Sequence, residues 1–314
     1  MIIIIKKYII ILMLLIFCLT FSSCSEEKAE GEVYYSFTDS EDREVVLEKK
    51  PEKVAVLFSS YAEMWNLAGG EVNITVGEAV ERGFADENTV LVDSGAGKTI
   101  DRELLITSAP DFVIASADIA AQAELAGYLD SIGIACALIR VDSFYDYAEV
   151  MEDLCKITGR DDLYEKNVTE IANEIENIIG SVDKTKAPRI IFVRCGSSAS
   201  STKAKNADEN FVCRMIAELG GVNIADEAPE LCDGLSLEAI LTAQPEKMLI
   251  STMGNEQKSR EYMDSVLKSE PWQALDAVKN GNYVYLDKEL FQFKPNARWA
   301  EAYKFLAEYL YGEG

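Results

Sequence analysis

One long helical segment in the middle of the chain most constrains how this sequence folds. Over residues 163–179 the apolar residues fall at helical spacings without a strand signal, and Gly180 closes the segment. On both sides of it, short apolar runs typical of buried strands alternate with amphipathic stretches typical of helices. This alternation predicts an α/β fold with mostly parallel sheets. We therefore expect two Rossmann-like α/β lobes joined by a single long α-helix.

The same patterns give the boundaries of the two lobes. We expect the N-terminal lobe over residues 33–160, the linker helix over 161–186 and the C-terminal lobe over 187–314. The predicted strands cover residues 53–58, 111–115, 135–141, 189–193, 247–251 and 283–286. The predicted helices cover residues 61–68, 120–132, 145–158, 210–219, 259–267 and 297–310.

An internal repeat supports the division into two lobes. Glu103 stands seven residues before Pro110 in the first half, and Glu238 stands at the same spacing before Pro245 in the second. Each copy predicts a short helix whose glutamate lies in the first turn, where a carboxylate suits the helix dipole, and whose proline ends the helix before a strand. Capping is one role for the two glutamates. A matched pair of docking residues is the other.

The N-terminus has the form of an export signal. Lys6 and Lys7 precede an apolar run over residues 8–21, and small residues come before Cys24. A basic start, an apolar centre and a small-residue cleavage site are typical of a secretory signal peptide, here residues 1–23. The run before Cys24 resembles the bacterial lipobox, whose cysteine is lipidated, with Phe21 where leucine is usual. The alternative is an uncleaved membrane anchor, because the apolar run approaches the length that spans a bilayer.

Composition excludes several classes of function. The formal net charge of −24 disfavours nucleic acid and anionic lipid headgroups as partners. The chain has no histidine, which excludes histidine-dependent catalytic triads and histidine-ligated zinc or heme sites. Residues 24–32 are polar and charged, so we expect a flexible tether there. The cysteines beyond Cys24 are odd in number and widely spaced, which favours small buried residues; a bridge between Cys195 and Cys213 stays open.

Several segments together resemble the substrate-binding proteins of iron-siderophore, heme and cobalamin ABC importers. The segments begin at Tyr35, Pro51, Glu103, Leu219, Leu237 and Pro295; they read YSFTDSEDREVVL, PEKVAVL, ELLITSAPDFVI, LGGVNI, LEAILTAQP and PNARW. Their order and spacing extend the resemblance over residues 33–311. The resemblance implies a periplasmic-binding-protein-like fold of class III, in which one stiff helix joins two lobes and allows only a modest hinge motion.

The resemblance also implies partners and roles. In that family one glutamate on each lobe is offered to arginines of the permease dimer, and the matching residues here are Glu103 and Glu238. We expect a monomer outside the cytoplasm, held to the cell membrane by a lipid on Cys24. We expect no enzymatic activity and no resident cofactor.

Loops at the carboxyl ends of the predicted strands should meet between the lobes and bind the ligand, since this is where open α/β sheets bind small molecules. Cations in these loops are plausible partners of carboxylate or catecholate oxygens, with solubilising surface charge as the alternative. Aromatic residues would supply flat apolar walls, with a place in the core as the alternative. The candidate ligand-binding residues are Tyr61, Arg140, Tyr145, Arg194, Lys203, Lys205, Phe291 and Arg298.

The predicted ligand is a ferric siderophore or a related metal chelate. The chelate itself coordinates the iron, so the protein needs to provide only cations and aromatic side chains around it. A corrinoid ranks second, because it would need fewer cations. Heme ranks third, with Tyr61 as a possible axial ligand.

Two other classes of protein stay open. A serine hydrolase would pair the serines at 197–201 with Lys203 but lacks an elbow motif, and an adhesive lipoprotein without a small ligand would have no closed cleft between its lobes.

Overall fold

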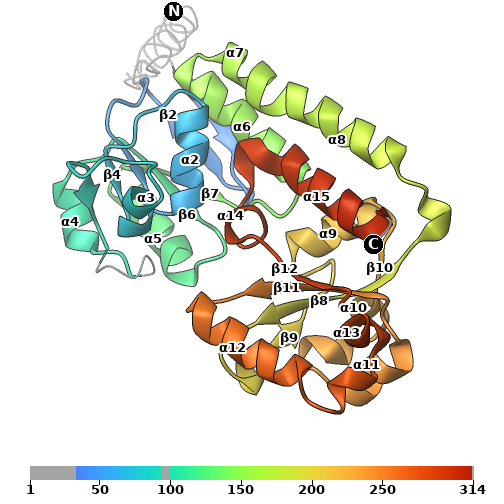
Figure 1. Ribbon diagram of the computed structural model, residues 1–314. Coiled ribbons are helices and arrows are strands. Elements are labelled where there is room, and N and C mark those ends of the chain that lie inside the picture. Colours follow the sequence, from blue (N-terminus) through green and yellow to red (C-terminus); the bar gives the residue numbers. More distant parts are fainter. Residues whose placement is uncertain (1–32, 94–98, 313–314) are drawn as a thin grey trace, which may run out of the picture.

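The computed structural model describes residues 33–93 and 99–312. The expected signal peptide, Cys24 and the tether over 24–32 lie outside the described residues. Within the described ranges no helix combines the length and the apolar character needed to cross a bilayer. Figure 1 shows two α/β lobes, one above the other, with a long helical segment running along one side of both.

The N-terminal lobe contains an antiparallel hairpin and a parallel sheet. The hairpin joins β1 (Tyr35–Thr38) to β2 (Glu44–Leu47). The five-stranded sheet has the order β5-β4-β3-β6-β7. Its strands are β3 (Val54–Val56), β4 (Ile74–Thr75), β5 (Val90–Leu91), β6 (Phe112–Ser116) and β7 (Ala135–Ile139). The helices of this lobe are α2 (Ser59–Leu67), α3 (Gly77–Glu81), α4 (Arg102–Thr107), α5 (Ala120–Ser131) and α6 (Phe144–Thr158).

The linker is helical from Asp161 to Ser181 and contains the predicted helix over 163–179. It consists of α7 (Asp161–Tyr164), a π-helical turn η1 (Glu165–Thr169) and α8 (Glu170–Ser181). Val168, Ile171 and Ile175 bury one side of it, which explains the helical spacing of apolar residues in the sequence. The segment therefore packs along its length and does not stand free between the lobes.

The C-terminal lobe repeats the arrangement of the first. Its sheet has the order β10-β8-β11-β12, with β9 paired antiparallel to β8. The strands are β8 (Arg189–Cys195), β9 (Lys203–Ala204), β10 (Val222–Asn223), β11 (Lys247–Thr252) and β12 (Tyr283–Tyr285). The helices are α9 (Phe211–Glu218), α10 (Ile224–Glu227), α11 (Leu237–Ala243), α12 (Glu256–Leu267), α13 (Asp276–Lys279), α14 (Lys288–Phe291) and α15 (Trp299–Tyr311).

The internal repeat of the sequence is also a repeat of local structure. Helices α4 and α11 begin in the same way, because the side chains of Asp101 and Ser236 accept hydrogen bonds from the backbone N–H groups three residues later. Both helices end at a residue with left-handed backbone, Ala109 (φ 49°) and Gln244 (φ 44°), directly before the proline. The two copies thus place Glu103 and Glu238 at equivalent positions.

The acidic residue after each proline has the same structural role. The Asp111 carboxylate accepts hydrogen bonds from the backbone N–H groups of Glu52 and Lys53, just before β3. The Glu246 carboxylate accepts one from the backbone N–H of Arg189, at the start of β8. Each acidic residue therefore ties the first strand of its sheet to the strand that it precedes.

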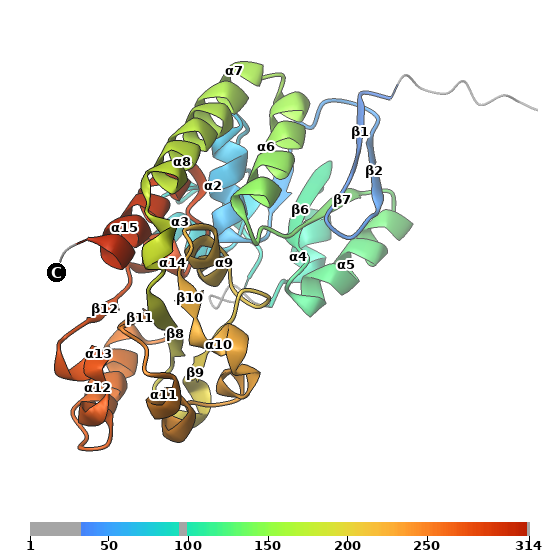
Figure 2. The ribbon, with the colours of Figure 1, turned by 90° about the vertical axis from the view of Figure 1, so that its right-hand side faces the viewer.

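Trp299 joins the cores of the two lobes. Its side chain is fully buried and makes edge-to-face contacts with Phe144 of the N-terminal lobe, at 6.2 Å between ring centroids, and Phe211 of the C-terminal lobe, at 5.6 Å. Tyr147 lies against it at 6.4 Å. Helix α15, which Trp299 begins, runs beside α8 in Figures 1 and 2. One continuous apolar cluster consequently links both sheets, the linker and the last helix.

The described cysteines are free thiols. Cys136, Cys155, Cys195 and Cys213 are buried, and Cys232 is half-buried. The expectation that most of them are small buried residues is confirmed, and the bridge between Cys195 and Cys213 that stayed open is not present. The Cys195 thiol instead donates to backbone carbonyl oxygens, including that of Ser259 at 3.3 Å.

We predict that Trp299→Ala lowers the free energy of unfolding by about 3–5 kcal/mol, because it opens a cavity where the two lobes meet. Urea unfolding followed by circular dichroism measures the change. Trp299→Phe is the matched control, because it keeps an aromatic ring and removes an indole N–H that has no hydrogen-bond partner among the described residues. Its loss of unfolding free energy should be less than half of the loss in Trp299→Ala. A loss below about 1 kcal/mol for Trp299→Ala would contradict this role.

Candidate functional site

Both sheets reverse their strand order at their first strand. In the N-terminal lobe the chain passes from β3 to β4 and β5 on one side and then to β6 and β7 on the other. In the C-terminal lobe β10 lies on one side of β8, and β11 and β12 lie on the other. The loops that follow β3, β6, β8 and β11 therefore come from the points where open α/β sheets bind ligands.

These loops meet at a cavity of about 520 Å³ between the lobes. Phe58, Glu78 and Ile119 line it from the N-terminal lobe. The C-terminal lobe contributes Arg194, Gly196, Ser197, Ser201, Met253, Gly254, Asn255, Gln292 and Phe293. The wall thus combines two aromatic rings with small residues, hydroxyl groups, one carboxylate and one guanidinium. The volume of the cavity is in the range of small-molecule sites.

Arg194 carries the positive charge of this cavity. It lies near the end of β8 and is directly opposite Lys203 on the antiparallel strand β9. Directly opposed residues of an antiparallel pair project on the same face, and like charges there repel. Burial lowers the pKa of Arg194, and no neighbouring carboxylate counters that effect. The two cations therefore stand opposite each other, and neither forms an ion pair with a carboxylate among the described residues. Of the two, only Arg194 lines the cavity.

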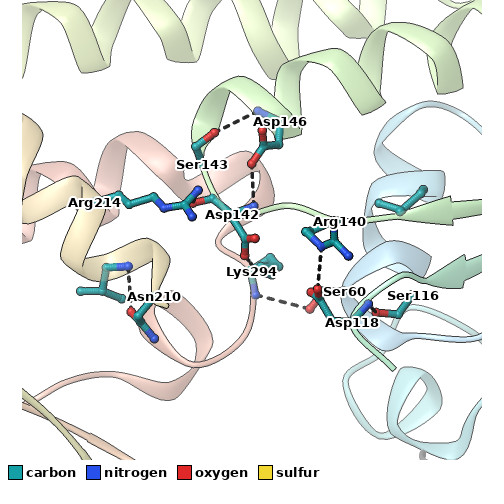
Figure 3. Close-up of polar contacts among 12 residues, drawn as sticks. Ser60, Ser116, Asp118, Arg140, Asp142, Ser143, Asp146, Asn210, Arg214 and Lys294 are labelled. Atoms are coloured by element: carbon teal, nitrogen blue, oxygen red, sulfur yellow. Dashed lines mark hydrogen bonds and ion pairs between the residues drawn. The ribbon is translucent and has the colours of Figure 1, made fainter. Parts of the chain in front are cut away.

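A polar cluster beside the cavity links the lobes, and Figure 3 shows it from close range. The Lys294 ammonium lies 3.4 Å from the carboxylate of Asp142, which follows β7. The backbone N–H of Lys294 donates to the hydroxyl of Ser60 at 3.4 Å. The Arg214 guanidinium of α9 donates to backbone carbonyl oxygens, including that of Asp142 at 3.5 Å. The segment after β12 is thus tied to the first turn of α2 and to the loop after β7 in the N-terminal lobe.

A second tie involves a buried amide in the same segment. The Asn296 side chain is fully buried and donates to the Ser60 carbonyl oxygen at 2.9 Å and to the Glu63 carboxylate at 2.7 Å. Burial raises the pKa of Glu63, while the hydrogen bond from Asn296 and the charge of Arg82 oppose that rise. This contact anchors the turn before α15 on α2.

Four of the expected ligand-binding residues lie on the surface or in ion pairs. Arg140 pairs with Asp118 at 2.9 Å (Figure 3) and with Glu41 at 2.6 Å, so two nitrogens of its guanidinium are occupied. Lys205 pairs with Glu209, and Arg298 pairs with Glu301. Tyr145 is 68% exposed. None of these four lines the cavity between the lobes.

Two aromatic residues that we expected at the ligand are core residues instead. Tyr61 is fully buried, and its hydroxyl donates to the Ile139 carbonyl oxygen at 2.9 Å; burial raises its pKa. Phe291 is buried against Phe305, with ring centroids 5.3 Å apart. Both follow a strand in sequence, but the helix that starts there turns them inward. The aromatic walls of the cavity are Phe58 and Phe293.

Sequence reasoning missed Arg82, which connects the lobes. Its guanidinium contacts the rings of Phe84 and Phe293 and pairs with Glu289 at 3.0 Å. Arg82 follows α3, a helix of only five residues. A segment of five residues is too short to show a helical period in the sequence. The alternation of arginine with an aromatic residue at Arg82 and Phe84 was the only sequence signal for this contact.

Glu103 and Glu238 are exposed and lie in the first turns of α4 and α11. Figure 1 places α4 at the outer part of the upper lobe and α11 at the outer part of the lower lobe. Neither glutamate forms an ion pair with another described residue. The described residues contain no group of three or more histidine, cysteine or acidic side chains arranged to hold a metal ion.

Residues 54–290 match the family described as periplasmic binding protein. The chain belongs to the periplasmic binding protein family. This match, together with the two-lobed architecture, confirms the family and the class III fold that the sequence motifs indicated. No curated protein matches the sequence of this periplasmic binding protein significantly.

Solved structures share the fold of this periplasmic binding protein at low sequence identity. The periplasmic heme-binding protein RhuT from Roseiflexus sp. RS-1 is 19% identical, with a TM-score of 0.66 over 83% of this chain and 98% of its own. An ABC transporter substrate-binding protein from Listeria monocytogenes EGD-e is 18% identical, with a TM-score of 0.67 over 84% and 100%. Staphylococcus aureus SirA complexed with staphyloferrin B is 14% identical, with a TM-score of 0.63 over 87% and 96%.

Proposed function

We propose that this periplasmic binding protein is the substrate-binding component of an ABC importer and captures an anionic ferric siderophore between its lobes. The match to the periplasmic binding protein family supports a solute-binding role outside the cytoplasm, and we expect no enzymatic activity. The ligand would enter the cavity lined by loops of both lobes and then pass to a permease dimer. We expect the protein to act as a monomer.

The observation that carries this proposal is the cation Arg194 in the cavity wall, with a second cation, Lys203, directly opposite it on the neighbouring strand. Arg194 and Lys203 face the same side of β8 and β9 without a carboxylate partner among the described residues. Their mutual repulsion is a cost that an anionic ligand would remove, because its oxygens would pair with both. Phe58 and Phe293 in the same wall suit the flat rings of a catecholate or the apolar arms of a chelate.

Relatives give two candidate ligand classes, and the site favours one. RhuT is described as heme-binding, and SirA was solved with staphyloferrin B. Heme requires an axial ligand. This chain has no histidine, and the hydroxyl of Tyr61, the tyrosine that we considered for that role, is held by a backbone carbonyl inside the core. A chelate that supplies its own iron ligands fits better. A corrinoid ranks behind it because the cations would then lack a partner.

Neither of the two other classes gains support from the geometry. An adhesive lipoprotein would need no cavity between its lobes, whereas this chain has one lined by loops of both. The serines at 198–201 bond mainly to one another within a turn: the hydroxyls of Ser198 and Ser201 lie 2.9 Å apart. Lys203 forms no hydrogen bond with them among the contacts of the described residues. A Ser/Lys nucleophile is therefore not assembled.

We predict that the purified protein binds ferric staphyloferrin B more tightly than hemin or cyanocobalamin. Quenching of tryptophan fluorescence measures the dissociation constants. Arg194→Ala and Lys203→Ala should each raise the constant roughly ten- to hundredfold, because each removes a charged partner of the ligand. Arg160→Ala is the matched control, since Arg160 lies in an exposed ion pair with Asp162 away from the cavity. Equal binding by the Arg194 and Arg160 variants would overturn the assignment of the site.

We also propose that Glu103 and Glu238 dock the permease dimer. The two residues occupy equivalent, exposed positions of a repeated structure, one on each lobe. Exposed carboxylates without ion-pair partners are available to arginines of another protein. Their position in the first turn of each helix is also favourable to the helix dipole, and the two roles are compatible.

The double variant Glu103→Ala with Glu238→Ala should abolish uptake of the radiolabelled ferric complex by intact cells and leave its dissociation constant unchanged. The exposed pair Glu174 and Glu176 on α8 serves as the control, because replacing both by alanine removes the same charge from a different surface. Normal uptake by the Glu103 and Glu238 variant would refute docking through these residues.

Finally, we propose that a lipid on Cys24 holds the protein at the cell membrane and that residues 25–32 tether the folded body to it. The form of residues 1–23 as an export signal supports this proposal. Cys24→Ala should release the protein into the soluble fraction, as an immunoblot of fractionated cells would show. A variant that stays in the membrane fraction with residues 1–23 still attached would favour an uncleaved anchor.

A further inference from the structure

Arg82 makes polar contacts with residues of both lobes. Its side chain is only 9% exposed, and its guanidinium donates to the hydroxyls of Ser59 at 3.0 Å and Ser60 at 3.2 Å. These contacts hold it against the N-terminal lobe. The carboxylate of Glu63, at 3.9 Å, adds an attraction from the same lobe.

The other partners of Arg82 belong to the segment that follows β12 in the C-terminal lobe. Two guanidinium nitrogens donate to the Glu289 carboxylate, at 3.0 and 3.2 Å. The guanidinium carbon lies 3.9 Å from the ring centroid of Phe293, which is within the range of a cation–π contact. The ring centroid of Phe84, in the N-terminal lobe, lies 4.7 Å from the same carbon. The Arg82 side chain therefore contacts the C-terminal lobe through an ion pair and through a cation–π contact.

The residues that Arg82 holds are also walls of the cavity. Phe293 and its neighbour Gln292 line the cavity from the C-terminal lobe. On the opposite wall, the Ser59 hydroxyl that accepts from Arg82 donates to the Glu78 carboxylate at 2.6 Å, and Glu78 also lines the cavity. Arg82 itself does not line the cavity. It therefore acts on the cavity through residues of both walls.

We propose that Arg82 is a positioning residue that sets the width of the ligand cavity by clamping the Phe293 wall to the Glu78 wall. This inference rests on the proposed function of the cavity. A planar guanidinium suits the task because it donates to several oxygens at once while stacking on a ring, which an ammonium cannot do. Preorganised walls bind a ligand more tightly because less ordering is needed on binding.

The test compares Arg82→Ala, Arg82→Lys and Glu289→Ala with a matched pair inside one lobe. Arg260 has the same kinds of contact, an ion pair with Glu256 at 2.9 Å and the ring of Tyr285 at 4.5 Å, but all its partners lie in the C-terminal lobe. Hydrogen exchange of the amides over residues 287–298 is measured in the unliganded proteins. Dissociation constants are measured with ferric staphyloferrin B.

We expect Arg82→Ala to speed exchange over residues 287–298 and to weaken binding about tenfold, with a smaller effect of lysine. The effects of Arg82→Ala and Glu289→Ala on binding should be less than additive, because each breaks the same contact. Arg260→Ala should change neither measurement. Wild-type exchange rates in Arg82→Ala would overturn the clamp, and faster exchange with unchanged affinity would overturn its effect on the cavity. If the wild-type protein does not bind the ferric complex, the proposed function is wrong. The hydrogen-exchange measurement then still tests whether Arg82 holds the two walls together.

Discussion

The packing of Trp299 between rings of both lobes is the contact on which the rest of this structure depends. Phe144 comes from the first turn of α6 in the first lobe and Phe211 from the first turn of α9 in the second, and the indole contacts both rings. Because Trp299 begins α15, the same contact fixes the helix that lies beside the linker α8. The two sheets therefore have a set separation. A protein interior of this kind is close-packed and yields little to small forces.

The close-packed lobes also carry a pair of like charges near the cavity. Arg194 and Lys203 stand opposite each other on β8 and β9, and the pairing of these two strands keeps their backbones side by side. The cost of this arrangement is offset by the apolar core elsewhere, which is the usual relation between a binding site and the fold that carries it. In a chain with a net charge of −24, carboxylates are plentiful. One of them, Glu78, lines the same cavity, but none pairs with Arg194 among the described residues, and this supports the proposal of an anionic ligand.

The sequence was sufficient for the parts of the fold that depend on long apolar patterns. The central strands β6, β8 and β11 are buried runs of five to seven residues and were predicted close to their observed bounds. The hairpin of β1 and β2 and the two-residue strands β4, β5, β9 and β10 were not predicted, because two to four residues do not establish a period. The repeat around Glu103 and Glu238 was recognised because identical spacing survives where individual residues differ.

Side-chain orientation explains most of what the sequence could not predict about the site. Tyr61 and Phe291 follow strands, as ligand-binding residues often do, but each sits on the inner side of the helix that begins there. Arg140 was expected at the ligand, yet Glu41 from the unpredicted hairpin turn and Asp118 neutralise it. Arg82 acts through partners that lie more than 200 residues away in the chain, such as Glu289. No local pattern encodes such a contact.

The most direct test of the account is an anomalous-difference map at the iron absorption edge, calculated from crystals of the protein purified from its native host. Such a map locates iron without assuming the chemistry of the chelate. The account predicts one iron peak in the cavity between the lobes, enclosed by a chelate that contacts Arg194 and is flanked by Phe58 and Phe293. A peak outside this cavity, or a cavity occupied by a molecule without iron, would contradict it.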